Sequence, residues 1–100
     1  MNLSKVDKAL DKYQNHFFKM IDHNLIDENK KQSYLNELSL IMFRLEIKKK
    51  RIESLYTEVD QNEINDCIKK SIEEKKQRFD VTLERMGEFF DIVRCTYCDN

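Results

Sequence analysis

Residues 34–47 decide the fold of this chain, and they read YLNELSLIMFRLEI. Successive residues of an α-helix are turned by about 100° around its axis. On such a helix, four residues of the stretch share one face: Leu35, Leu38, Met42 and Leu45. Three more lie on nearly the opposite face: Leu40, Phe43 and Ile47. The stretch therefore predicts a helix that is apolar on two sides.

The flanking sequence predicts where this helix begins and ends and adds one helix on each side. Residues 24–27 and 58–62 are short breaks between helical segments, and Asp27 is a suitable N-cap for the helix that follows it. Apolar residues recur at steps of three and four between the breaks. This spacing predicts helices over residues 4–24, 28–59 and 62–97.

The third helix is the least regular of the three. Asp60 and Glu63 have the spacing of a capping box and mark its expected start. Gly87 falls inside it, and glycine costs about 1 kcal/mol relative to alanine in a helix. If the helix is interrupted, we expect the kink or early end at Gly87.

Short breaks between helices favour antiparallel neighbours. We therefore predict an all-α fold, a single helical domain over residues 1–100. It is an antiparallel three-helix bundle, or a long helical hairpin with a shorter N-terminal helix packed at one end. At that end the second helix would lie between the other two, which would explain its two apolar faces. The opposite end, residues 48–78, would project as a helix pair with too few apolar residues to be stable alone.

The composition argues against several classes of protein. The chain has 100 residues, no proline, one glycine and a net charge of −1. One glycine cannot build a glycine-rich phosphate loop, and nucleic-acid-binding domains are usually basic. The longest apolar run, residues 40–43, is far shorter than the ~20 residues that span a bilayer. We expect no membrane partner and a cytoplasmic location, with export that needs no cleaved signal as the alternative.

Few residues are suited to chemistry. Cys95 and Cys98 form a C-x-x-C pair, and two thiolates at this spacing can hold a metal ion or form a redox pair. A zinc site needs two further ligands, and His16 and His23 are too far apart on one helix to supply both. No catalytic set of side chains is evident. We expect neither an enzyme nor a cofactor, and a metal or redox sensor is the alternative that the two cysteines leave open.

Nine basic residues lie between residues 48 and 78. Such a cluster can meet phosphates or an acidic partner. Neighbouring glutamates neutralise much of the charge, however, and the interleaved aromatic residues of single-strand binders are missing. Nucleic-acid binding is therefore a second alternative rather than the expected function. The densest run is Lys48, Lys49, Lys50 and Arg51, and the pairs Lys69–Lys70 and Lys75–Lys76 fall on the third helix.

The surplus of apolar residues is the most informative feature for function. Several large ones fall outside the faces that a three-helix core would bury. We expect six of them to form an exposed contact surface: Leu40, Phe43, Ile47, Val81, Phe89 and Ile92. An exposed apolar helix face is typical of a site for another protein or for a second copy of the chain. The sequence therefore predicts a non-enzymatic interaction module, such as a helical adaptor, a secretion-type chaperone or a phage-encoded inhibitor.

Overall fold

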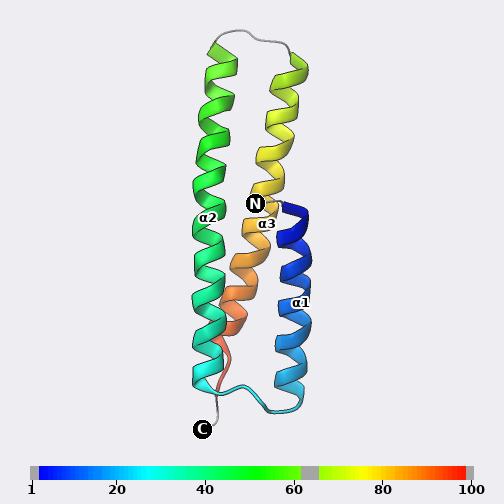
Figure 1. Ribbon diagram of the computed structural model, residues 1–100, viewed down its shortest axis with the longest axis vertical. Helices are drawn as coiled ribbons and strands as arrows, with labels where there is room; N and C mark the ends of the chain where they lie inside the picture. The colour runs from blue at the N-terminus through cyan, green and yellow to red at the C-terminus, as the bar shows by residue number, and fades with distance from the viewer. Residues whose placement is uncertain (1–2, 62–65, 99–100) are drawn as a thin grey trace.

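Three helices make up the part of the chain that the computed structural model describes, residues 3–61 and 66–98. They are α1 (Leu3–Asp22), α2 (Glu28–Gln61) and α3 (Asp66–Cys95). The molecule measures 59 × 18 × 17 Å, because α2 and α3 are long and lie side by side (Figure 1). The predicted all-α fold is confirmed.

The helices divide the molecule into two regions. α2 and α3 form an antiparallel pair, and α1 packs beside one half of that pair (Figure 1). We call the covered half the three-helix end, residues 3–47 and 79–98. The uncovered half is the two-helix arm, residues 48–61 and 66–78. This arrangement is the predicted long hairpin with a shorter N-terminal helix at one end.

The predicted place of the second helix between the other two is wrong. α1 packs closely against α3, and its backbone stays farther from α2. Consequently Leu40, Phe43 and Ile47, on the far side of α2, are exposed. The helix that both others approach closely is α3, so the second apolar face of α2 does not reflect a second neighbour within the described chain.

The turn after α1 ends that helix at Asp22, two residues before the predicted end. Asn24 has a left-handed backbone with a φ of 55°, which asparagine tolerates better than most residues. Its N–H donates to the carbonyl of Ile21 at 2.9 Å. The N–H of Leu25 donates to the carbonyl of Met20 at 2.8 Å. These two bonds form a Schellman motif, which satisfies carbonyls that the helix end leaves open.

Asp27 caps α2, as predicted. Its carboxylate accepts a hydrogen bond of 2.7 Å from the backbone N–H of Lys30, the third residue of the helix. The N–H groups of a first helical turn have no partner within the helix, so this bond stabilises the start of α2 by about 1 kcal/mol.

The C-terminal ends of α2 and α3 depart from the sequence prediction by two residues each. α2 continues to Gln61 because Val59 is buried and Asp60 pairs with Lys69 of α3. The predicted start of the third helix, with Glu63 as its capping residue, lies outside the described residues. α3 passes through Gly87 without interruption and ends at Cys95.

Thr96 accounts for the end of α3. Its hydroxyl donates to the carbonyl of Ile92 at 2.7 Å, and its N–H donates to the carbonyl of Val93 at 3.2 Å. The carbonyl of Thr96 accepts a bond of 3.0 Å from the Nζ atom of Lys31 on α2. The last turn therefore closes on itself and is tied to the start of the neighbouring helix.

Aromatic rings from all three helices meet at the centre of the three-helix end. The ring of Phe17 lies 5.4 Å from that of Tyr34 and 5.5 Å from that of Phe89, both nearly edge to face. Such pairs add to the stabilisation from buried area. The core around them is apolar: Val6, Leu10, Ile26, Leu38, Leu45, Phe79, Met86 and Val93.

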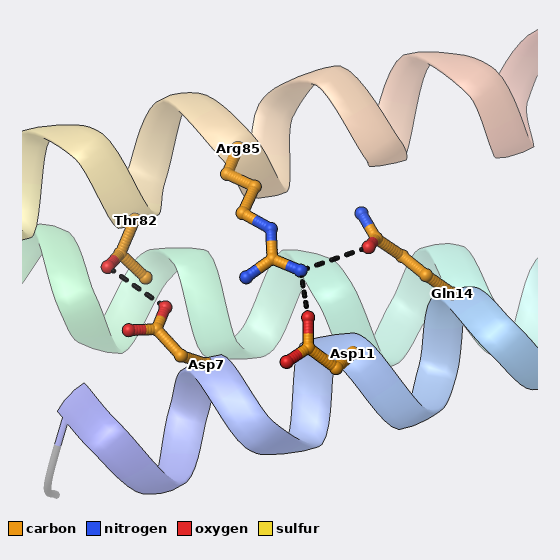
Figure 2. Close-up of polar contacts among 5 residues, drawn as sticks. All are labelled: Asp7, Asp11, Gln14, Thr82 and Arg85. Carbon is orange, nitrogen blue, oxygen red and sulfur yellow. Dashed lines mark hydrogen bonds and ion pairs between the residues drawn. The ribbon is translucent and has the colours of Figure 1, made fainter.

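Polar contacts hold α1 on α3 along the edge of this core (Figure 2). The Arg85 guanidinium reaches from α3 to α1, where it pairs with Asp11 and donates to Gln14 Oε1 at 3.1 Å. One turn earlier, the hydroxyl of the buried Thr82 donates to Asp7 Oδ1 at 3.2 Å. Thr82 thus reaches the helix interface without leaving its hydroxyl unsatisfied.

Candidate interaction surfaces

The first candidate surface is the outer face of α2, formed by Leu40, Phe43 and Ile47. Their exposed fractions are 51%, 63% and 38%. Leu45 is fully buried, and Phe43 lies two residues before it, or about 200° around the helix. The three side chains therefore point away from the core, as the sequence predicts.

The second candidate surface is the outer face of α3, formed by Val81 and Ile92. They are 66% and 46% exposed. Val81 lies two residues after the buried Phe79, again about 200° around its helix. Because α2 and α3 pack through their buried faces, their outer faces look in opposite directions. The predicted contact surface is therefore two separate surfaces.

Phe89 does not belong to either surface, and its predicted exposure is wrong. Its side chain is only 1% exposed. Its ring lies against those of Phe17, at 5.5 Å, and Phe18, at 6.4 Å, both on α1. The periodicity of α3 alone places Phe89 on the flank of the helix, and it is α1 that covers this flank.

A groove lies between α1 and α2, whose backbones are farther apart than those of α1 and α3. Near the start of α1 it opens into a cavity of about 220 Å³. Apolar residues supply most of the cavity lining: Val6, Ala9, Leu10, Tyr13, Leu38, Ile41 and Met86. Ile41 is the sequence neighbour of Leu40, so the groove lies next to the outer face of α2.

His16 and Tyr34 join across this groove. His16 Nδ1 lies 2.6 Å from the Tyr34 hydroxyl oxygen. Burial raises the pKa of Tyr34, and the negative charge of Glu37 adds to the effect. A hydrogen bond with Glu37 raises the pKa of Tyr13, which burial raises further. Both phenols are therefore neutral at pH 7, and the His16–Tyr34 contact joins α1 to α2.

The run from Lys48 to Arg51 does not form one patch, because a helix distributes four consecutive residues around its axis. Lys49 faces α3 and forms an ion pair of 2.5 Å with Asp80. It also lies 4.0 Å from Glu53. The hydrogen bond with Asp80 raises the pKa of Lys49. Lys49 is thus a structural residue of the helix pair.

Lys48 and Arg51 line a basic pocket at the junction of the three-helix end and the arm. The pocket has a volume of about 470 Å³. Its floor is apolar and comes from Leu3, Ile52 and Phe79, and its four basic side chains are Lys48, Arg51, Lys75 and Arg78. Sequence reasoning placed Lys75 on the facing helix but missed Arg78. The position of Arg78 depends on the register between α2 and α3, which the sequence alone does not give. The ion pairs Lys49–Asp80 and Asp60–Lys69 fix this register and place Arg51 opposite Arg78.

The fold separates Cys67 from the other two cysteines. Cys67 and Cys95 lie near opposite ends of α3, and all three cysteines are free thiols. Cys98 packs against the core, and burial raises the pKa of its thiol, with Glu28 adding to the effect. A raised pKa disfavours the thiolate that metal binding and redox exchange require. Within the described ranges, no group of three or more His, Cys, Asp or Glu residues could hold a metal ion.

Two further findings bear on function. None of the helices, over the residues that the structure describes, is both long and apolar enough to cross a membrane. Comparisons of the chain with protein-family models, with curated proteins and with solved structures gave no match. The case for a function therefore depends on the surfaces described above.

Proposed function

We propose that this chain is a non-catalytic protein–protein interaction module that binds a helix of another protein. The observation that carries the proposal is the outer face of α2. Leu40, Phe43 and Ile47 expose large apolar side chains on one side of a well-packed helix. Burial of such area in a complex is favourable by about 25 cal/mol per Å². An apolar face of this kind is the usual docking site for an amphipathic helix.

The size of the surface favours a partner helix that also enters the neighbouring groove. Three side chains over two helical turns make a small area, and stable interfaces bury about 800 Å² per partner. The apolar groove beside Ile41 extends the surface toward α1. A helix lying along both would contact α2 and α1 at once. The proposed module would be a helical adaptor, a secretion-type chaperone or a phage-encoded inhibitor, and the cytoplasm suits three free thiols.

The test compares two double variants with the unaltered chain. Phe43→Glu with Ile47→Glu places two charges on the outer face of α2. Leu55→Glu with Ile68→Glu makes the same chemical change at exposed apolar residues of the arm. Both variants should remain helical, because all four side chains are exposed.

The readouts are the mass in light scattering and the affinity for a partner captured from the source cells and then purified. We expect the first variant to lose at least about tenfold in affinity, since a buried unpaired charge costs several kcal/mol. The control should bind as the unaltered chain does. A mass near twice 12.2 kDa that only the first variant reduces would identify the partner as a second copy. Equal loss in both variants, or none in either, would contradict the proposal.

A further inference from the structure

We propose that the basic pocket binds a small anionic amphiphile, a molecule that joins an apolar body to one carboxylate, sulfonate or phosphate group. The pocket lies between α2 and α3 where α1 begins. It is separate from the outer face of α2, so this proposal stands or falls independently of the proposed function.

The distribution of charge is the first argument. Elsewhere along the helix pair, opposite charges face each other, as in Lys49–Asp80 and Asp60–Lys69. At the pocket the same register sets Arg51 opposite Arg78, so like charges meet across the helices. Like charges at close range repel, and a bound anion would convert the repulsion into attraction.

Two acidic residues near the pocket are already paired with another lysine. Asp80 and Glu53 both lie against Lys49, on the side of α2 that faces α3. Among the residues that the structure describes, no hydrogen bond or ion pair joins Arg51, Lys75 or Arg78 to another side chain. Their donors are available to a ligand, and a guanidinium can bind a carboxylate or phosphate through two parallel hydrogen bonds.

The floor of the pocket is the second argument. Phe79 is buried, and Leu3 and Ile52 are half-buried, so the base of the cavity is apolar beneath a basic rim. Its volume of about 470 Å³ lies within the range of small-molecule sites. A bare inorganic anion would leave this floor without a partner. A neutral apolar molecule would leave Arg51, Lys75 and Arg78 without a partner for their charges. An anionic amphiphile satisfies both.

The probe for this site is 8-anilinonaphthalene-1-sulfonate, an aromatic sulfonate whose fluorescence reports apolar surroundings. Arg51→Gln with Arg78→Gln removes two charges from the rim. Lys50→Gln with Lys70→Gln removes two charges at exposed residues that do not line the pocket. We expect the rim variant to bind the probe about tenfold more weakly, and the control variant to bind it as the unaltered chain does. Binding to the unaltered chain should weaken as salt is added.

Displacement of the probe defines the ligand class. Octanoate should displace it, whereas acetate, which lacks the apolar body, and octanol, which lacks the charge, should not at the same concentration. A single-stranded oligonucleotide that displaces the probe more effectively than octanoate would overturn the proposal in favour of a polyanion. Equal displacement by octanol would contradict the proposal, because it would mean that the site binds apolar molecules whether or not they carry a charge.

Folding of the rim variant is checked by thermal unfolding. Removing two like charges that face each other should leave the melting temperature unchanged or raise it. A folded rim variant that binds the probe as tightly as the control would overturn the proposal. If the rim variant unfolds instead, the single change Arg78→Gln carries the same test, with half of the charge removed.

Discussion

The three-helix end and the two-helix arm are built from the same two helices, and they differ in what covers them. In the three-helix end, α1 adds a third side, and rings from all three helices meet around Phe17. In the arm, α2 and α3 bury only Val59 and Ile72 among the described residues, while Leu55 and Ile68 remain exposed. From this difference in buried area we expect the helix pair to be more stable at the three-helix end than in the arm.

Ion pairs between α2 and α3 partly compensate for the small buried core of the arm. Lys69 pairs with Asp60 across it, and Lys49 pairs with Asp80 at its base. These pairs are substantially exposed, and exposed pairs contribute at most about 1 kcal/mol each. The arm should therefore open more readily than the three-helix end, and its amide protons should exchange sooner.

The largest expected effect comes from removing a ring at the three-helix end. Phe89→Ala should lower the free energy of unfolding by about 4 kcal/mol, because it removes a fully buried ring that contacts α1. Ile72→Ala in the arm should cost only about 2 kcal/mol. Urea denaturation followed by circular dichroism measures both. If Ile72→Ala lowers the free energy of unfolding as much as Phe89→Ala does, the arm and the three-helix end do not differ in packing as described above.

A smaller effect of opposite sign is expected at Gly87. A Cβ atom added there meets nothing within 4 Å, and the helix continues through it. Gly87→Ala should therefore raise the free energy of unfolding by about 1 kcal/mol. Ser71→Ala, at an exposed residue of the arm, is the matched change. It should raise the free energy of unfolding by about half as much.

Hydrogen exchange then separates the two alanine variants. Gly87→Ala should slow exchange in the three-helix end, whereas Ser71→Ala should slow it only in the arm if the arm opens independently. Equal slowing of both regions by Ser71→Ala would mean that the molecule opens as one unit.

The smallest effect concerns alkaline pH. The pKa values of Tyr13 and Tyr34 are raised in the folded chain above the ordinary value of 10.0. Their neutral forms therefore stabilise the fold fully below pH 10, and this contribution is lost as the pH rises through the raised values. The double variant Tyr13→Phe, Tyr34→Phe should lose less stability between pH 9 and pH 11 than the unaltered chain. Urea denaturation at the two pH values measures the difference, and an equal loss in both proteins would contradict the assignment.

Much of the fold could be predicted from the sequence, but only part of the candidate surfaces. The helices, the Asp27 cap and the position of Leu40, Phe43 and Ile47 on one face of the second helix follow from local spacing. The burial of Phe89 does not, because that residue lies on the flank of α3 and its exposure depends on where α1 packs. The convergence of Arg51 and Arg78 does not follow from local spacing either, because it depends on the register between α2 and α3.

The sequence by itself determined that this protein is three amphipathic helices joined by short turns, since periodicity and caps act within a few residues of one another. Only the tertiary structure decided which apolar faces are covered and which basic residues converge. Both outcomes depend on the packing of helices far apart in the chain, and α1 packs closely against α3 rather than α2. That choice buries Phe89, leaves the outer face of α2 exposed, and adds Leu3, at the start of α1, to the floor of the basic pocket.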